Sequence, residues 1–253
     1  MVRNAITLLV VMLFYSNMGR SGAQAPTHAP LQDVAQPSSS KHMTAAMILW
    51  GGGAAGIVET ITPAKVGNRA TWRVTHYSLD PTGTKTNEYD LYDLDRETLA
   101  PIRSVRNTQA YRLDLNFGEK EANLRNTTSR STVTEKIPLN TGVQAEGPGL
   151  DVFVAGLPLQ LGYRVRYTIV DRWSGRGANR VKTVTLSVLR RSMENTSLGR
   201  REIYQLVIEA EDGSFQIKEN VLADDPHYPV RVEYTRGRKT YPASEVVSLE
   251  ACP

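Results

Sequence analysis

Apolar and polar residues alternate with a period of two along most of the chain beyond residue 55. In residues 111–117 and 163–169 the odd-numbered positions are apolar or aromatic, and in residues 230–234 the even-numbered positions are. Such alternation predicts strands with one buried and one solvated face, as in antiparallel sheets. Residues 202–210 have apolar side chains at both odd and even positions, so we expect a central strand there that is covered on both sides.

Short turn sequences lie between these strand-like segments. They are Gly67-Asn68, Asp80-Pro81-Thr82-Gly83, Gly118-Glu119-Lys120, Asp212-Gly213 and Arg236-Gly237. Asp-Gly pairs are typical of tight β-hairpins, so the chain is expected to run back and forth between neighbouring strands. No segment after residue 60 keeps an apolar helical stripe over four turns, which argues against alternating strands and helices.

One short helix is predicted near the middle of the chain. Asp151 is expected to cap a turn formed by residues 152–155, which Gly156 and Pro158 end. The sequence therefore predicts a mainly β protein, with about ten antiparallel strands in a strongly curved sheet or open half-barrel and a helical plug at residues 151–157. A two-sheet β-sandwich is the structural alternative. The polar segment 123–135 is expected to form an exposed edge strand or a mobile loop.

The first 23 residues have the pattern of a signal peptide. A basic residue, Arg3, precedes an apolar segment at 6–15 that is too short to span a bilayer, and small residues at 21–23 offer a cleavage site. Residues 24–42 are rich in Pro, Ser, Gln and Ala and are expected to be a flexible tether before a single β-rich domain at 43–253. We expect an exported protein, periplasmic or secreted, that is soluble after cleavage and has no transmembrane segment.

Charge and cysteine content exclude several classes of protein. The formal net charge is +4, and loss of Arg3 and Arg20 with the signal peptide leaves the chain close to neutral. Basic and acidic residues alternate along the predicted strands, which argues against a nucleic-acid surface. Cys252 is the only cysteine, so no internal disulfide can form and stability must come from packing.

Gly51, Gly53 and Gly56 have the spacing of a dinucleotide-binding loop. That loop requires a helix immediately after it, whereas branched residues and Pro63 follow here. We therefore expect a flexible or bulged entry to a strand, and no cofactor.

Two sets of potential metal ligands were considered. Asp224, Asp225 and His227 share a turn and could recruit a metal together with His76, and residues 90–95 contain three aspartates that suggest calcium. The first set is foremost a turn sequence, and alternation places Asp90 on the opposite face from the other two aspartates. No metal site and no catalytic residue are predicted.

The sequence Asp-Val-Phe-Val-Ala-Gly-Leu-Pro-Leu at 151–159, followed by Leu161-Gly162-Tyr163, resembles the central signature of an exported bacterial family, the domain-of-unknown-function family number 3108. The segments 67–72, 93–95 and 98–101 are similar to the early hairpins of that family. The resemblance covers roughly residues 57–249. It implies a periplasmic or secreted β-rich domain, related in shape to half-barrels that carry lipoproteins, and it implies no enzyme activity.

A curved sheet leaves a concave face on which large aromatic side chains can hold an apolar ligand. The candidate ligand-binding residues are Trp72, Phe153, Tyr163, Tyr167 and Trp173, and Trp173 is expected to lie exposed on a polar, Gly-rich loop. We expect a non-enzymatic binding or carrier module for an apolar small molecule, a lipid or a component of the cell envelope. Two alternatives stay open: a hydrolase of envelope polymers that uses dispersed carboxylates, and a structural subunit of an envelope complex.

Overall fold

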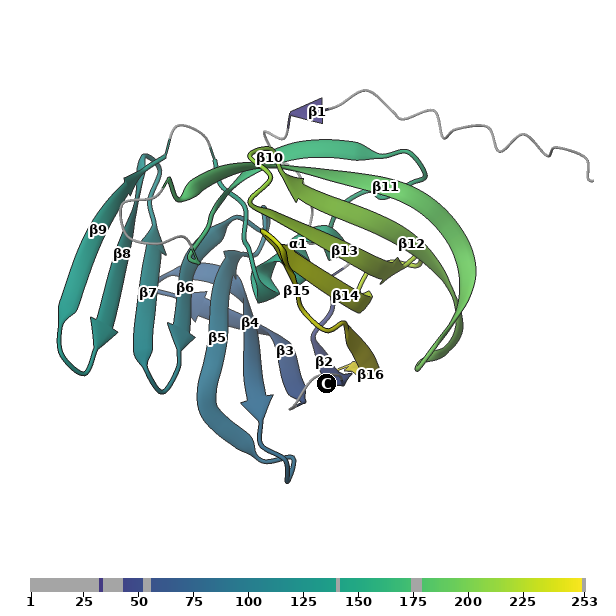
Figure 1. Ribbon diagram of the computed structural model, residues 1–253, viewed down its shortest axis with the longest axis horizontal. Helices are drawn as coiled ribbons and strands as arrows, with labels where there is room; N and C mark the ends of the chain where they lie inside the picture. The colour runs from purple at the N-terminus through teal and green to yellow at the C-terminus, as the bar shows by residue number, and fades with distance from the viewer. Residues whose placement is uncertain (1–31, 34–42, 52–55, 140–141, 174–178, 252–253) are drawn as a thin grey trace, which may run out of the picture.

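The computed structural model describes residues 32–33, 43–51, 56–139, 142–173 and 179–251, and the predicted signal peptide, most of the predicted tether and Cys252 lie outside these ranges. All strands in these ranges belong to one sheet (Figure 1). They are β1 (Gln32–Asp33), β2 (Ala46–Gly51), β3 (Ile57–Val66), β4 (Arg69–Leu79), β5 (Lys85–Asp95), β6 (Pro101–Asn107), β7 (Tyr111–Phe117), β8 (Glu121–Thr128), β9 (Thr132–Pro138), β10 (Arg164–Val170), β11 (Val181–Thr196), β12 (Gly199–Ala210), β13 (Phe215–Leu222), β14 (Pro229–Arg236), β15 (Lys239–Thr240) and β16 (Ser244–Ala251).

The sheet consists of two halves, each built from strands that are neighbours in sequence. Strands β2 to β9 form one half, and β10 to β14 together with β16 form the other. The two halves meet where β16 pairs antiparallel with β2, and β15 pairs only with β14. Among the described strands β9 is one edge and β1, parallel to β10, is the other, so the sheet is open.

The predicted open, curved β-sheet is confirmed, and the two-sheet sandwich is not found among the described residues. The expected number of about ten strands was too low, because the described ranges contain sixteen. Strands such as β9 and the second half of β11 carry polar residues on both faces, so apolar alternation does not reveal them. The polar segment 123–135 forms parts of β8 and of the edge strand β9, in agreement with the edge-strand expectation.

The predicted turns are found, and the predicted central strand is found but is less buried on its second face than expected. All five turn sequences connect consecutive strands of the sheet. Segment 202–210 lies in β12 between β11 and β13, but only Ile203 is fully buried on its second face, whereas Val207 is half-buried. The glycine-rich segment at 51–56 is followed by β3 and not by a helix, which rules out the dinucleotide-binding geometry.

The helix α1 (Pro148–Ala155) begins four residues before the predicted turn at 152–155. Asp151 does not cap it: the cap position is Gly147, whose φ of 56° suits glycine, and Pro148 fits the first turn because its φ is already fixed. A Cβ added to Gly149 would lie 2.6 Å from Cβ of Ala145, so this helix lies unusually close to its neighbours. Every residue of α1 is buried.

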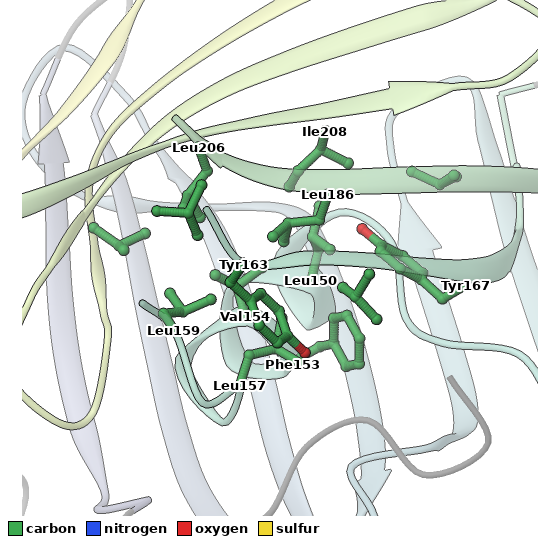
Figure 2. Close-up of a cluster of buried hydrophobic side chains, with 14 of the residues drawn as sticks. Leu150, Phe153, Val154, Leu157, Leu159, Tyr163, Tyr167, Leu186, Leu206 and Ile208 are labelled. Atoms are coloured by element: carbon green, nitrogen blue, oxygen red, sulfur yellow. The ribbon is translucent and has the colours of Figure 1, made fainter. Parts of the chain in front are cut away.

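The helix packs between the two halves of the sheet. Leu150, Phe153 and Val154 pack against apolar side chains of β10 to β13, and Figure 2 shows these side chains converging. Val152 and Ala155 pack against a second cluster, formed mainly by β2 to β5. Each large apolar side chain buried in this way contributes about 2 kcal/mol. The helix thus fills the inside of the curved sheet as a plug, as the sequence predicted.

Candidate functional site

A cavity of about 280 Å³ lies beside α1, between the two halves of the sheet. Most of its wall is apolar and comes from strands β10 to β14. The apolar lining includes Tyr167, Ile169, Val184, Ile208, Phe215, Ile217, Val232 and Tyr234. Trp50, Ile57 and His76 from β2 to β4 complete the opposite side, and the start of α1 contributes Leu150 and Asp151. Such a size and lining are close to the lower end of the range for small-molecule sites.

Four ionisable side chains, which we call the Glu59 cluster, lie close together here: His76, Asp151 and Glu219 line the cavity, and the buried Glu59 pairs with His76. Nε2 of His76 lies 2.5 Å from Oε2 of Glu59 and 3.9 Å from Oδ2 of Asp151. The indole Nε1–H of Trp50 donates a hydrogen bond of 3.2 Å to the same Glu59 oxygen. One ligand atom from each of Glu59, His76 and Asp151 lies within 4.8 Å of the other two.

Burial controls the protonation of this cluster. The pKa of Asp151 is raised well above its ordinary value, first by burial and then by the charges of Glu59 and Glu219. Burial, with a further contribution from the charge of Glu59, raises the pKa of Glu219 to about 8. Glu219 is therefore mostly protonated at neutral pH, when it can donate a hydrogen bond as well as accept one.

Several oxygen atoms of the cluster are buried without a partner. Oε1 of Glu59 and both carboxyl oxygens of Glu219 have no hydrogen-bond partner among the described residues. No Lys or Arg of the described ranges pairs with Glu59, Asp151 or Glu219. Because a buried polar group without a partner costs about 1–3 kcal/mol, a group that donates a hydrogen bond to these oxygens would stabilise the protein.

A second polar network holds the loop after β10 beside the cavity. The side chain of Arg172 is 2% exposed and contacts Oε1 of Glu146 at 2.7 Å and Oδ1 of Asp90 at 3.2 Å, and its guanidinium lies 4.8 Å from the centre of the Tyr92 ring. The pKa of Glu146 is raised by burial, and the charge of Arg172 opposes this effect. The network fixes the backbone that leads to the cavity lining at 171–173.

The predicted ligand-binding aromatics occupy three different places. Tyr167 and Trp173 line the cavity, and Trp173 is 49% exposed beneath the guanidinium of Arg106 at 3.9 Å. Phe153 and Tyr163 lie in the core shown in Figure 2, where Phe153 contacts the Tyr167 ring at a centroid distance of 4.9 Å. Trp72 is buried in the second core cluster. The structure thus brings two of the five to the cavity.

Most of the potential metal ligands that the sequence suggested form ion pairs with other side chains. His227 pairs with Asp225 at 3.1 Å, whereas His76 pairs with Glu59. Asp93 is held by Arg73 at 2.7 Å. The other two aspartates of that segment also pair with arginines, Asp90 with Arg106 and Asp95 with Arg69.

Sequence reasoning missed Glu59 and Glu219 and considered His76 only as a partner of the Asp224 turn, although the alternation contained a signal for the two glutamates. Each interrupts a series of inward-facing apolar positions: Glu59 lies between Ile57 and Ile61, and Glu219 between Ile217 and Val221. An ionisable residue on the dry face of a strand is costly and therefore informative. The pattern does not show that three separate strands and the helix bring these residues together.

Three matches among solved structures have low sequence identity and TM-scores below 0.5. One is a beta-barrel-like protein of the domain of unknown function DUF1849 from Brucella abortus, with 13% identity, a TM-score of 0.40, and coverage of 82% of this chain and 96% of that chain. Another, from Bacteroides fragilis, is described as an exported protein with a YmcC-like fold, with 8% identity, a TM-score of 0.33 and coverage of 85% and 99%. A third, from Parabacteroides distasonis, is described as a lipoprotein, with 8% identity, a TM-score of 0.34 and the same coverage.

None of the curated proteins matches the chain. Within the described ranges, no helix has both the length and the apolar character that crossing a membrane requires. The sequence model of the family described as "Protein of unknown function (DUF3108)" matches residues 48–237. This match covers most of the chain and includes every strand from β3 to β14. The chain therefore belongs to the DUF3108 family.

Proposed function

We propose that the protein is a non-enzymatic, exported binding module that takes up an amphipathic ligand. The apolar part of the ligand would lie along the wall formed by β10 to β14, and its polar group would face the Glu59 cluster. The observation that carries this proposal is the combination of an apolar cavity with buried carboxyl oxygens that have no partner. An apolar pocket with a few convergent polar groups is the usual form of a small-molecule site.

The two parts of the cavity explain why the ligand should be amphipathic. Ile169, Val184 and Ile208 offer no hydrogen bond, so a fully polar ligand would lose its hydration without compensation. At the other end, the partly protonated carboxyl groups can both donate and accept, which favours a hydroxyl, amide or amine over a carboxylate or phosphate. A ligand with an alkyl or aromatic body and a neutral or cationic polar group satisfies both ends.

An exported location is part of the proposal. It is supported by the signal-peptide pattern of residues 1–23, which a tether at 24–42 and a single domain at 43–253 would follow. Lipids and other amphipathic molecules of the envelope would then be the ligands within reach. A protein that carries such a ligand and a protein that senses it would both need a cavity that binds it.

A hydrolase is the second candidate, because Asp151 and Glu59 lie close together and Asp151 has a raised pKa. The burial of these two groups argues against it: Glu59 is 0% exposed and Asp151 9% exposed. A polymer strand needs an open cleft between the two carboxyl groups, which this buried arrangement does not provide. Asp151→Asn should therefore leave any envelope-polymer hydrolysis by purified protein unchanged, whereas a loss of turnover in this variant would support the hydrolase.

The ligand can be sought directly. Protein purified without detergent is extracted with organic solvent and the extract analysed by mass spectrometry, and the stripped protein is titrated with a dansyl-labelled alkylamine and with a dansyl-labelled alkyl carboxylate. We expect a co-purifying amphipathic compound and saturable binding with a preference for the amine. Absence of an extracted compound together with no saturable binding of either probe would contradict the proposal.

A further inference from the structure

We propose that Glu59, His76 and Asp151 bind a divalent transition-metal ion, with Zn²⁺ as the best fit, and that the open coordination position faces the cavity. The proposal goes beyond amphipathic ligand binding and does not depend on it. Each residue supplies one atom, Nε2 of His76 and a carboxyl oxygen of each acid, and these three atoms lie within 4.8 Å of one another. Three protein ligands with a free position are typical of zinc sites that bind water or a further ligand.

The spacing of these atoms is close to what the ion needs. Zn²⁺ binds nitrogen and carboxylate oxygen at about 2.0–2.2 Å, which separates neighbouring ligand atoms by about 3.4 Å in a tetrahedron. The distance from His76 to Glu59 is 2.5 Å and that from His76 to Asp151 is 3.9 Å, so the required distance lies between them. Small changes of side-chain torsion, opening the first contact and closing the second, would admit the ion.

The scaffold around these residues is rigid. Glu59 is the third residue of β3, and its registered partner on β4 is His76, so the sheet itself holds the two side chains next to each other. Asp151 lies on α1, which is buried along its whole length. The Trp50 indole donates to Glu59 and orients its carboxylate, which is the arrangement that metal ligands commonly have in their surroundings.

Charge provides a second and independent argument. Glu219 lines the same cavity, is 1% exposed, and has no hydrogen-bond partner for either oxygen among the described residues. Oε1 of Glu59 has none either. Glu59 and Asp151 thus face one imidazole, Glu219 lies close to both acids, and no Lys or Arg of the described ranges pairs with any of the three. A divalent cation would stabilise the ionised forms of these buried acids.

The chemistry of the ligand set selects the class of ion. Ca²⁺ and Mg²⁺ take oxygen ligands, whereas the imidazole of His76 favours Zn²⁺ or another transition metal. The fourth ligand would come from the cavity, because His76 and Asp151 both line it. Water, or the polar group of an amine or hydroxyl compound, would fit there.

Zinc titration of the tag-free full chain tests the proposal, in a Cys252→Ser background that removes the only thiol. Isothermal titration calorimetry should show one Zn²⁺ per chain. Glu59→Gln and His76→Ala should weaken binding at least tenfold, and Trp50→Phe by about tenfold through lost orientation of the carboxylate. His227→Ala is the matched control, since it removes another histidine paired with a carboxylate, and it should bind as the parent does.

Two results would overturn the proposal: substoichiometric Zn²⁺ binding by the parent, or equal binding by the parent and by folded Glu59→Gln and His76→Ala variants. If those variants do not fold, the parent alone decides through its Co²⁺ complex. Intense visible absorption indicates four- or five-coordinate cobalt and supports the site, whereas only the weak bands of six-coordinate aquo-cobalt contradict it. Dansyl-alkylamine binding by metal-free protein is measured separately, so failure of the metal site and failure of the ligand proposal give different results.

Discussion

Nε2 of His76 lies 2.5 Å from Oε2 of Glu59, a carboxylate whose side chain has no exposed surface. Within the described ranges His76 is the only basic side chain paired with Glu59, and the register of β3 and β4 places the two opposite each other. In the metal-free protein, the pairing of this buried carboxyl group with a basic side chain thus depends on one imidazole ring.

His76→Ala should lower the free energy of unfolding of metal-free protein by about 3 kcal/mol, because it leaves Glu59 buried without its partner. Glu59→Gln should cost less, since the amide still accepts the hydrogen bond of Trp50 and no charge is left behind. The double variant should then be more stable than the sum of the two effects predicts. Urea unfolding in the presence of a chelator measures all three, and strictly additive effects would show that the two residues do not interact.

The stability of metal-free protein should fall as the pH rises from about 4.5 to about 8 through the contribution of Glu219. Its pKa is about 8 in the folded protein against an ordinary value of 4.5. The folded state therefore holds a proton that the unfolded state has lost, and this contribution is complete below 4.5 and gone above 8. Asp151 acts in the same direction. Chemical unfolding of Glu219→Gln across this range should show a flatter pH dependence than the parent, and parallel curves would contradict the assignment.

Val184→Phe should block the cavity. Val184 lines it from β11 and is 1% exposed, so a larger side chain there must occupy part of the 280 Å³ volume. We expect the affinity for the dansyl-labelled alkylamine to fall at least tenfold in a fluorescence titration, with secondary structure unchanged. Val133→Phe, on the edge strand β9 and outside the cavity lining, is the control of equal size change and should bind normally.

Arg172→Met should destabilise the protein by about 3 kcal/mol, because it leaves the buried carboxyl of Glu146 without its cation. Arg231→Met is the matched control: it removes an arginine with two carboxylate partners whose side chain is 44% exposed, and should cost at most about 1 kcal/mol. Thermal unfolding of both variants at one pH provides the comparison. Equal losses would show that burial does not set the strength of these pairs.

The sheet was largely predictable from the sequence because its signals are local. Alternation within strands such as β7 and β10, and turns such as Asp212-Gly213, depend on residues next to each other in the chain. The start of α1 was not predictable in this way. Gly147 and Pro148 define it through their backbone conformation, and Asp151, which has the side chain of a capping residue, lies inside the helix instead.

The candidate site depends on pairings that alternation does not specify. Phe153 and Tyr167 are both aromatic, inward-facing and in mutual contact, yet only Tyr167 reaches the cavity. Glu59 and Glu219 belong to different halves of the sheet, and their proximity follows from the pairing of β16 with β2 and from the position of α1. Chemistry that is assembled across such a long separation in sequence becomes visible only in three dimensions.

The pairing of β16 with β2 has a consequence for the order in which the protein is made. Every other antiparallel pairing on the path between the two edges joins strands that leave the ribosome close together, whereas β2 must wait for nearly the entire domain to be synthesised before its second partner emerges. We expect nascent chains and C-terminally truncated fragments to hold two unjoined half-sheets. The cavity between them, with any ligand or ion bound in it, would then form only in the complete polypeptide.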